Sequence, residues 1–193
     1  MSELDLALSI ALGIGLAAAT GLRLFLPMLV VSAAAYTGHL PLSDNFAWLA
    51  TPAALILLGV ASLAEILAYY IPGVDNLLDT LATPAAFVAG TIISAAVITD
   101  VPPMVKWATA IIAGGGIAGL TQSVTTLVRA KSTVMTGTLA NPAVATAELG
   151  GSLVVSLLAL VAPLLTALLI VLLLWLALRW LRQLSRGRQP TKT

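Results

Sequence analysis

Long, unbroken stretches of apolar residues are the feature that most constrains this sequence. A helix needs about 20 such residues to cross the hydrocarbon core of a bilayer. Only 9% of the 193 residues are charged and 60% are hydrophobic, whereas a soluble domain carries about 25% charge. Lipid must therefore solvate most of the chain, and continuous runs favour helices over a barrel. The sequence predicts an all-α, polytopic transmembrane helix bundle, with apolar runs at 6–35, 46–71, 81–98, 104–127 and 143–178.

The last apolar run, 143–178, is too long for one crossing. As a single helix it would extend for roughly 54 Å at about 1.5 Å per residue, against a hydrocarbon core of about 30 Å. Pro163 lies in its middle and interrupts the helical hydrogen bonds. We therefore predict two spans, 143–162 and 164–180, with one long kinked helix as the alternative.

Basic residues predict the orientation, because they favour the cytoplasmic side. Arg129 and Lys131 place the 128–142 loop inside, and the C-terminal basic residues place the tail inside. Counting crossings from these two points gives about six spans, with both termini cytoplasmic. Residues 1–180 would form a single transmembrane domain, and residues 181–193 a basic cytoplasmic tail.

The two halves of the sequence share an order of motifs. The segment GLAAAT at 15–20 matches GIAGLT at 116–121, and Ala-Glu at 64–65 matches Ala-Glu at 147–148. A proline then begins the next predicted span in each half, at Pro84 and Pro163.

These matches predict an inverted-topology repeat of three plus three spans. Matching segments lie an odd number of spans apart, so the repeats 6–98 and 104–180 would have opposite orientations, as in many secondary transporters. Chance similarity between Gly- and Ala-rich helices is the alternative. The small residues around Gly15 and Gly116 also suit close packing of helices in lipid.

Three charged residues lie inside predicted spans: Arg23, Glu65 and Glu148. A charge at the bilayer centre costs about 2.5–3.5 kcal/mol on insertion scales, so we expect all three to face inward. Arg23 would then lie between the two glutamates, and Pro27 would break the helix beside it. The cluster either pins the helices together or forms a functional site, in which a carboxylate moves protons or Arg23 binds an anion.

The loop IPGVDNLLDTLATP at 71–84 contains the acids Asp75 and Asp79, one helical turn apart. They are either a helix cap and a solvated acid, or a cation or proton relay at the inner mouth, or part of a re-entrant segment. In the 129–142 loop, Asn141 would cap a helix that Pro142 begins. The basic residues of that loop would contact lipid headgroups, and an anion-attracting vestibule is the alternative.

Four stretches together resemble a bacterial membrane family known as domain of unknown function 4126. They are GLAAATGLRLFLP at 15–27, AEILAYYIPGVDNLLDTL at 64–81, AGGGIAGLTQ at 113–122 and NPAVATAELGGS at 141–152. The resemblance implies a multi-pass protein of the bacterial inner membrane, with either Arg or Asn at position 23. It brings no substrate and no reaction.

From these features we expect a transporter or channel-like carrier for a small solute or ion, coupled to protons, working as a homo-oligomer among membrane lipids. Its site would contain Arg23, Glu65, Glu148, Asp75, Asp79 and Asn141. A non-transporting scaffold or lipid-interacting subunit is the alternative. An intramembrane enzyme is a third class, and would need the two aspartates to hold a divalent ion. One histidine and no cysteine offer no zinc set and no Ser-His-Asp triad, so we expect no enzyme, cofactor, metal or nucleic acid.

Overall fold

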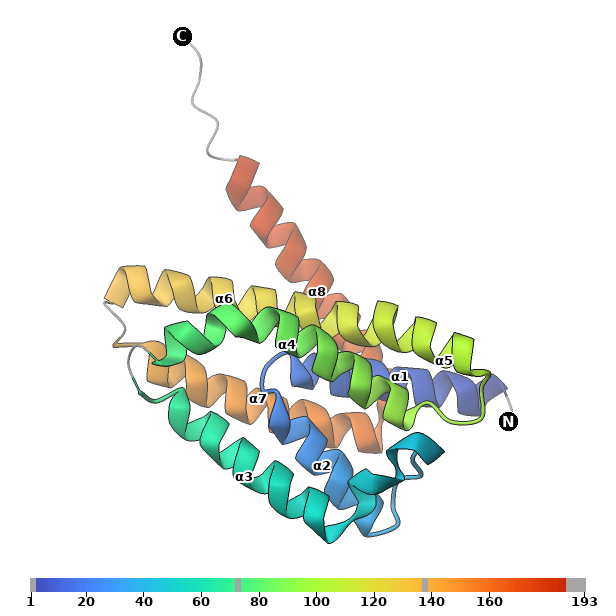
Figure 1. The fold of residues 1–193 in the computed structure, drawn as a ribbon. Coiled ribbons are helices and arrows are strands. Elements are labelled where there is room, and N and C mark those ends of the chain that lie inside the picture. Colours follow the sequence, from blue (N-terminus) through green and yellow to red (C-terminus); the bar gives the residue numbers. More distant parts are fainter. Residues whose placement is uncertain (1–2, 72–73, 137–138, 187–193) are drawn as a thin grey trace.

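The computed structural model describes residues 3–71, 74–136 and 139–186, and every regular element among them is helical (Figure 1). The first half contains α1 Glu3–Thr20, α2 Phe25–Tyr36, the 3-10 helix η1 Asp44–Ala50, α3 Pro52–Ala68 and α4 Val74–Val97. The second half contains α5 Pro103–Thr109, the π-helix η2 Ala110–Gly115, α6 Gly116–Thr136, α7 Asn141–Val161 and α8 Pro163–Arg186.

Four helical segments within the described residues are long and apolar enough to cross a membrane. A fifth candidate span results if η1 and α3, which meet at a bend of 71°, are counted as one span. The apolar helices thus support a helical membrane protein. They do not confirm the predicted six spans. The four segments are Glu3–Thr20, Thr80–Val97, Pro103–Thr136 and Asn141–Val161.

The first apolar run, 6–35, is two helices and not the single span that the sequence predicted. The chain leaves the helix after Thr20 and starts α2 at Phe25, so that α1 and α2 run in opposite directions (Figure 1). Gly21 lets the connection lie close against α6, because a Cβ there would collide with Thr121 and with the backbone of α6. The helix is thus broken beside Arg23, as predicted, but Pro27 lies within the first turn of α2 and not in the break.

This reversal does not fit the prediction that the start of the chain and the 128–142 loop lie on the same side. Figure 1 shows the start of α1 at one end of the bundle, and the end of α6 and the start of α7 at the other. The sequence placed both on the cytoplasmic side. The inverted repeat is not confirmed either: α3 and α7 run in opposite directions, but α1 and α6, which contain the matched segments, run in the same direction.

Two other helix boundaries differ from the predicted ones. Pro84 was expected to begin a span, but it lies inside α4, whose first turns precede it. The predicted 128–142 loop is mostly the last two turns of α6, which ends at Thr136. The predicted division at Pro163 is confirmed, because α7 ends at Val161 and α8 begins at Pro163.

Small residues bring α1, α4, η2 and α6 into close contact. The Ser94 hydroxyl of α4 donates a hydrogen bond of 3.0 Å to the Gly13 carbonyl of α1. A Cβ at Gly90 would lie 2.9 Å from the Gly114 carbonyl oxygen. Close packing is therefore the role of these glycines, and the buried core includes Leu16, Ala17, Ala86, Ile93, Val97 and Ala118.

Candidate functional site

Buried charges from two helices and one connection meet at the end of the bundle where α1 ends and α7 begins. Arg23 comes from the α1–α2 connection, Arg129 from α6 and Glu148 from α7. Tyr69, directly after α3, lies against both arginines. Arg23 is 1% exposed and Arg129 is 2% exposed, so bulk water can hydrate little of either charge.

Arg23 is the largest fully buried side chain of the described residues. Its Nη2 donates a hydrogen bond of 2.7 Å to the Ala145 carbonyl and lies 3.6 Å from Glu148 Oε2. Its guanidinium carbon lies 4.1 Å from the centre of the Tyr69 ring, within the range of a cation–π contact. Arg23 Nε and Nη1 are buried and make no hydrogen bond to the described residues.

Arg129 and Glu148 form a bidentate ion pair. Arg129 Nε donates to Glu148 Oε1 at 3.1 Å, and Nη2 donates to Oε2. The guanidinium carbon of Arg129 lies 4.4 Å from the centre of the Tyr69 ring. Paired N–H···O bonds of this kind fix geometry as well as supplying energy. Glu148 therefore compensates two guanidinium groups, one by paired hydrogen bonds and one by proximity.

Sequence reasoning missed Arg129, which it placed in a loop in contact with lipid headgroups. The sequence did contain a signal, since Ala118, Gln122 and Arg129 recur at helical spacing and all three are buried in α6. Extending the helical pattern beyond the apolar run would have placed Arg129 on the interior face.

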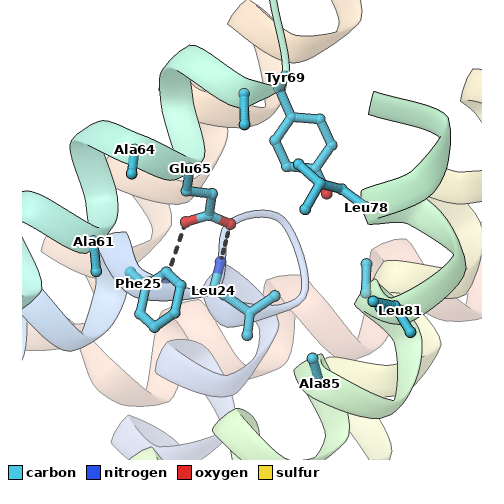
Figure 2. A pocket seen from close by; sticks show the side chains of 11 residues that line it. Leu24, Phe25, Ala61, Ala64, Glu65, Tyr69, Leu78, Leu81 and Ala85 are labelled. Atoms are coloured by element: carbon cyan, nitrogen blue, oxygen red, sulfur yellow. Dashed lines mark hydrogen bonds between the residues drawn. The ribbon is translucent and has the colours of Figure 1, made fainter. Parts of the chain in front are cut away.

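Glu65 lies beside Arg23 but binds the backbone. Its Oε1 accepts from the Leu24 amide at 2.7 Å, and its Oε2 accepts from the Phe25 amide at 3.0 Å (Figure 2). These amides stand at the start of α2, where helical N–H groups have no partner within the helix. A carboxylate is also favoured there by the helix dipole. The structure therefore brings both predicted glutamates to the Arg23 segment, in different roles.

A cavity of about 430 Å³ lies beside Glu65, between α3, α4 and the start of α2 (Figure 2). Apolar side chains surround it, and the Glu65 carboxylate is its charged group. Tyr69 lines the cavity and also lies over the Arg23 guanidinium. A single aromatic ring thus stands next to both the cavity and the buried cation. The wall also includes Leu24, Phe25, Leu78, Leu81 and Ala85.

The remaining predicted site residues lie apart from this arrangement or outside the described residues. Asn141 is buried, and its Nδ2 donates to Thr133 Oγ1 at 3.2 Å. It does not act as the predicted cap, because α7 has Ala140 at its cap position. The side chains of Asp75 and Asp79 lie outside the described residues, so their relay role stays a prediction.

Replacing Glu65 with Ala is expected to lower the free energy of unfolding by about 0.5–2 kcal/mol, as the loss of a helix cap does. The Leu24 and Phe25 amides would lose their acceptor. Thermal unfolding of the purified protein in detergent measures this change. Glu65→Gln keeps one acceptor oxygen and should cost less. Equal stability of Glu65→Ala and wild type would contradict the capping role.

Comparison with known proteins found one family. The family model described as "Domain of unknown function (DUF4126)" matches residues 10–183. No curated protein and no solved structure matches the chain. The matched range includes all the residues of the buried cluster, and the description names no substrate or reaction.

Proposed function

The chain belongs to the DUF4126 family, and because this description assigns no activity, we propose a function from the buried charges. The protein is an integral membrane carrier or channel for a small solute or ion, with Arg23 as its binding group and Glu65 and Glu148 beside it. We further propose that it works as a homo-oligomer in a bacterial cytoplasmic membrane, since one small bundle offers little room for a complete pathway.

The incomplete hydrogen bonding of Arg23 is the observation on which this proposal depends. Buried polar groups nearly always have partners, and those without one call for an explanation such as a missing ion or ligand. Arg23 Nε and Nη1 make no hydrogen bond to the described residues. A small anionic solute would satisfy the remaining N–H groups of Arg23.

Tyr69 stands where a gate for such a solute would be needed. Its ring lies over the Arg23 guanidinium and also forms part of the cavity wall. Rotation of this ring would connect the cavity to the cation. Glu65, on the same wall, would repel an anion while charged, and protonation would remove that repulsion. We therefore include coupling to protons in the proposal.

The test is flux through the purified protein in liposomes, with chloride, acetate and phosphate as separate probes. Wild type is expected to pass at least one probe faster than protein-free liposomes. Arg23→Gln should reduce that flux at least tenfold, because the guanidinium is the proposed binding group. Arg179→Gln, which changes an exposed cation of α8, is the matched control and should keep wild-type flux.

Two outcomes would overturn the proposal. The first is that none of the three probes crosses although the reconstituted protein is folded. The second is that Arg23→Gln transports as fast as wild type. If wild type shows no flux, and Arg23→Gln and Glu148→Gln alter only the stability, the cluster serves only to hold the helices together. The protein would then be a scaffold or a lipid-interacting subunit.

A further inference from the structure

A second, polar cavity lies at the other end of the bundle. Its volume is about 470 Å³, and it lies between the α2–η1 connection, the α4–α5 connection and α5. In Figure 1 this is the end where α1 begins, opposite the end of α6 and the start of α7. The cavity shares no lining residue with the one beside Glu65. Its polar lining consists of Ser43, Asp44, Thr99, Asp100 and Lys106.

Lys106 supplies a buried positive charge to this cavity. The residue is only 9% exposed, and its Nζ donates a hydrogen bond of 2.7 Å to Ser43 Oγ. The Ser43 amide in turn donates to the Ala96 carbonyl at 2.8 Å, which holds the serine in place. An ammonium group has three donors. Within the described residues no carboxylate forms an ion pair with Lys106, although a buried ammonium without a counter-charge is costly.

Two carboxylates line the same cavity. Asp44 and Asp100 are exposed, so water can hydrate them when the cavity contains no solute. The lining thus combines one buried cation with two accessible anions. A simple anion would be attracted by Lys106 but repelled by the two aspartates. A simple cation would be attracted by the aspartates but repelled by Lys106. A solute that carries both charges satisfies both sets of groups.

We propose that this cavity binds a small amino acid in its zwitterionic form. The carboxylate of the amino acid accepts hydrogen bonds from Lys106 Nζ, and its ammonium group pairs with Asp44 and Asp100. The proposal concerns binding at a site remote from Arg23. It therefore does not depend on the carrier function, and either can fail without the other.

Ligand-dependent thermal stabilisation of the purified full chain tests this site. The probes are glycine and alanine, with acetate and methylammonium as single-charge controls at the same concentration. A ligand that binds only the folded state raises the melting temperature as its concentration rises. Glycine or alanine should raise it, and neither single-charge probe should match that rise.

Variants then locate the binding. Lys106→Gln should weaken glycine or alanine binding at least tenfold. Because this variant removes a buried group and could unfold, the double variant Asp44→Asn with Asp100→Asn changes only exposed residues and should weaken binding to a similar degree. Glu3→Gln, an exposed acid at the start of α1, is the control and should bind as wild type does.

Four results would overturn the inference. Stabilisation by acetate equal to that by glycine would identify a simple anion site, and stabilisation by methylammonium alone would identify a cation site. No stabilisation by any amino acid, or unchanged binding in the double aspartate variant, would show that the cavity does not bind a zwitterion.

Discussion

Replacing Glu148 with Gln is expected to lower the free energy of unfolding by about 3–5 kcal/mol, as breaking a buried ion pair from one side does. Arg129 is 2% exposed and forms paired hydrogen bonds with this carboxylate. Arg23, 1% exposed, lies 3.6 Å from it. The substitution would leave two guanidinium groups buried against a neutral amide. Thermal or denaturant unfolding in detergent measures the loss.

A double variant separates the missing charge from the altered shape. Arg129→Met combined with Glu148→Leu removes one charge of each sign, and apolar replacements of this kind often restore or exceed the original stability. The double variant should therefore be more stable than Glu148→Gln. Glu3→Gln, an exposed acid of α1, should unfold within about 0.5 kcal/mol of wild type. A Glu148→Gln protein as stable as wild type would show that the arginines are not enclosed as described.

The second large effect is expected at Gly114, where α4 crosses η2. Replacing Gly114 with Ala should lower the free energy of unfolding by about 1–3 kcal/mol, because extra atoms in a close-packed contact force the helices apart. The new Cβ would lie 2.7 Å from the Gly90 carbonyl oxygen and would also collide with Ser94, whose hydroxyl binds Gly13. The backbone of α4 cannot yield as a flexible side chain would.

Gly116, two residues further along, is the matched control. A Cβ there meets no atom within 4 Å. Gly116→Ala should therefore raise stability, by up to about 1 kcal/mol, since alanine favours a helix more than glycine does. The same chemical change should thus have opposite signs at two positions of the same helical segment. Equal effects at Gly114 and Gly116 would contradict the close contact of α4 and η2.

Local sequence features predicted several parts of the structure correctly. The apolar runs predicted the helices, and Pro163 predicted the break between α7 and α8. The same reasoning failed where a long-range contact determines the path of the backbone. The chain reverses at 21–24, where the Glu65 carboxylate, some 40 positions away, binds the amides of Leu24 and Phe25. The apolar run 46–71 contains Glu65, but its composition does not show that this carboxylate binds backbone amides.

The candidate site was predicted in part for the same reason. Arg23 and Glu148 were expected to meet because a charge in an apolar run has few other places to go. Arg129 was missed because it follows the apolar run, in the amphipathic end of α6. Hydropathy measures how apolar a segment is. It does not show which polar side of that segment another helix will cover.

The sequence by itself determined that this chain is a helical membrane protein, because so few charges cannot keep so many apolar residues in water. It also determined that Arg23 and Glu148 need buried partners. Only the tertiary structure decided that Arg129 is one of those partners, that Glu65 binds backbone amides, and that Lys106 lies in a separate polar cavity. These pairings depend on which helices lie side by side, and residues distant in the chain decide that.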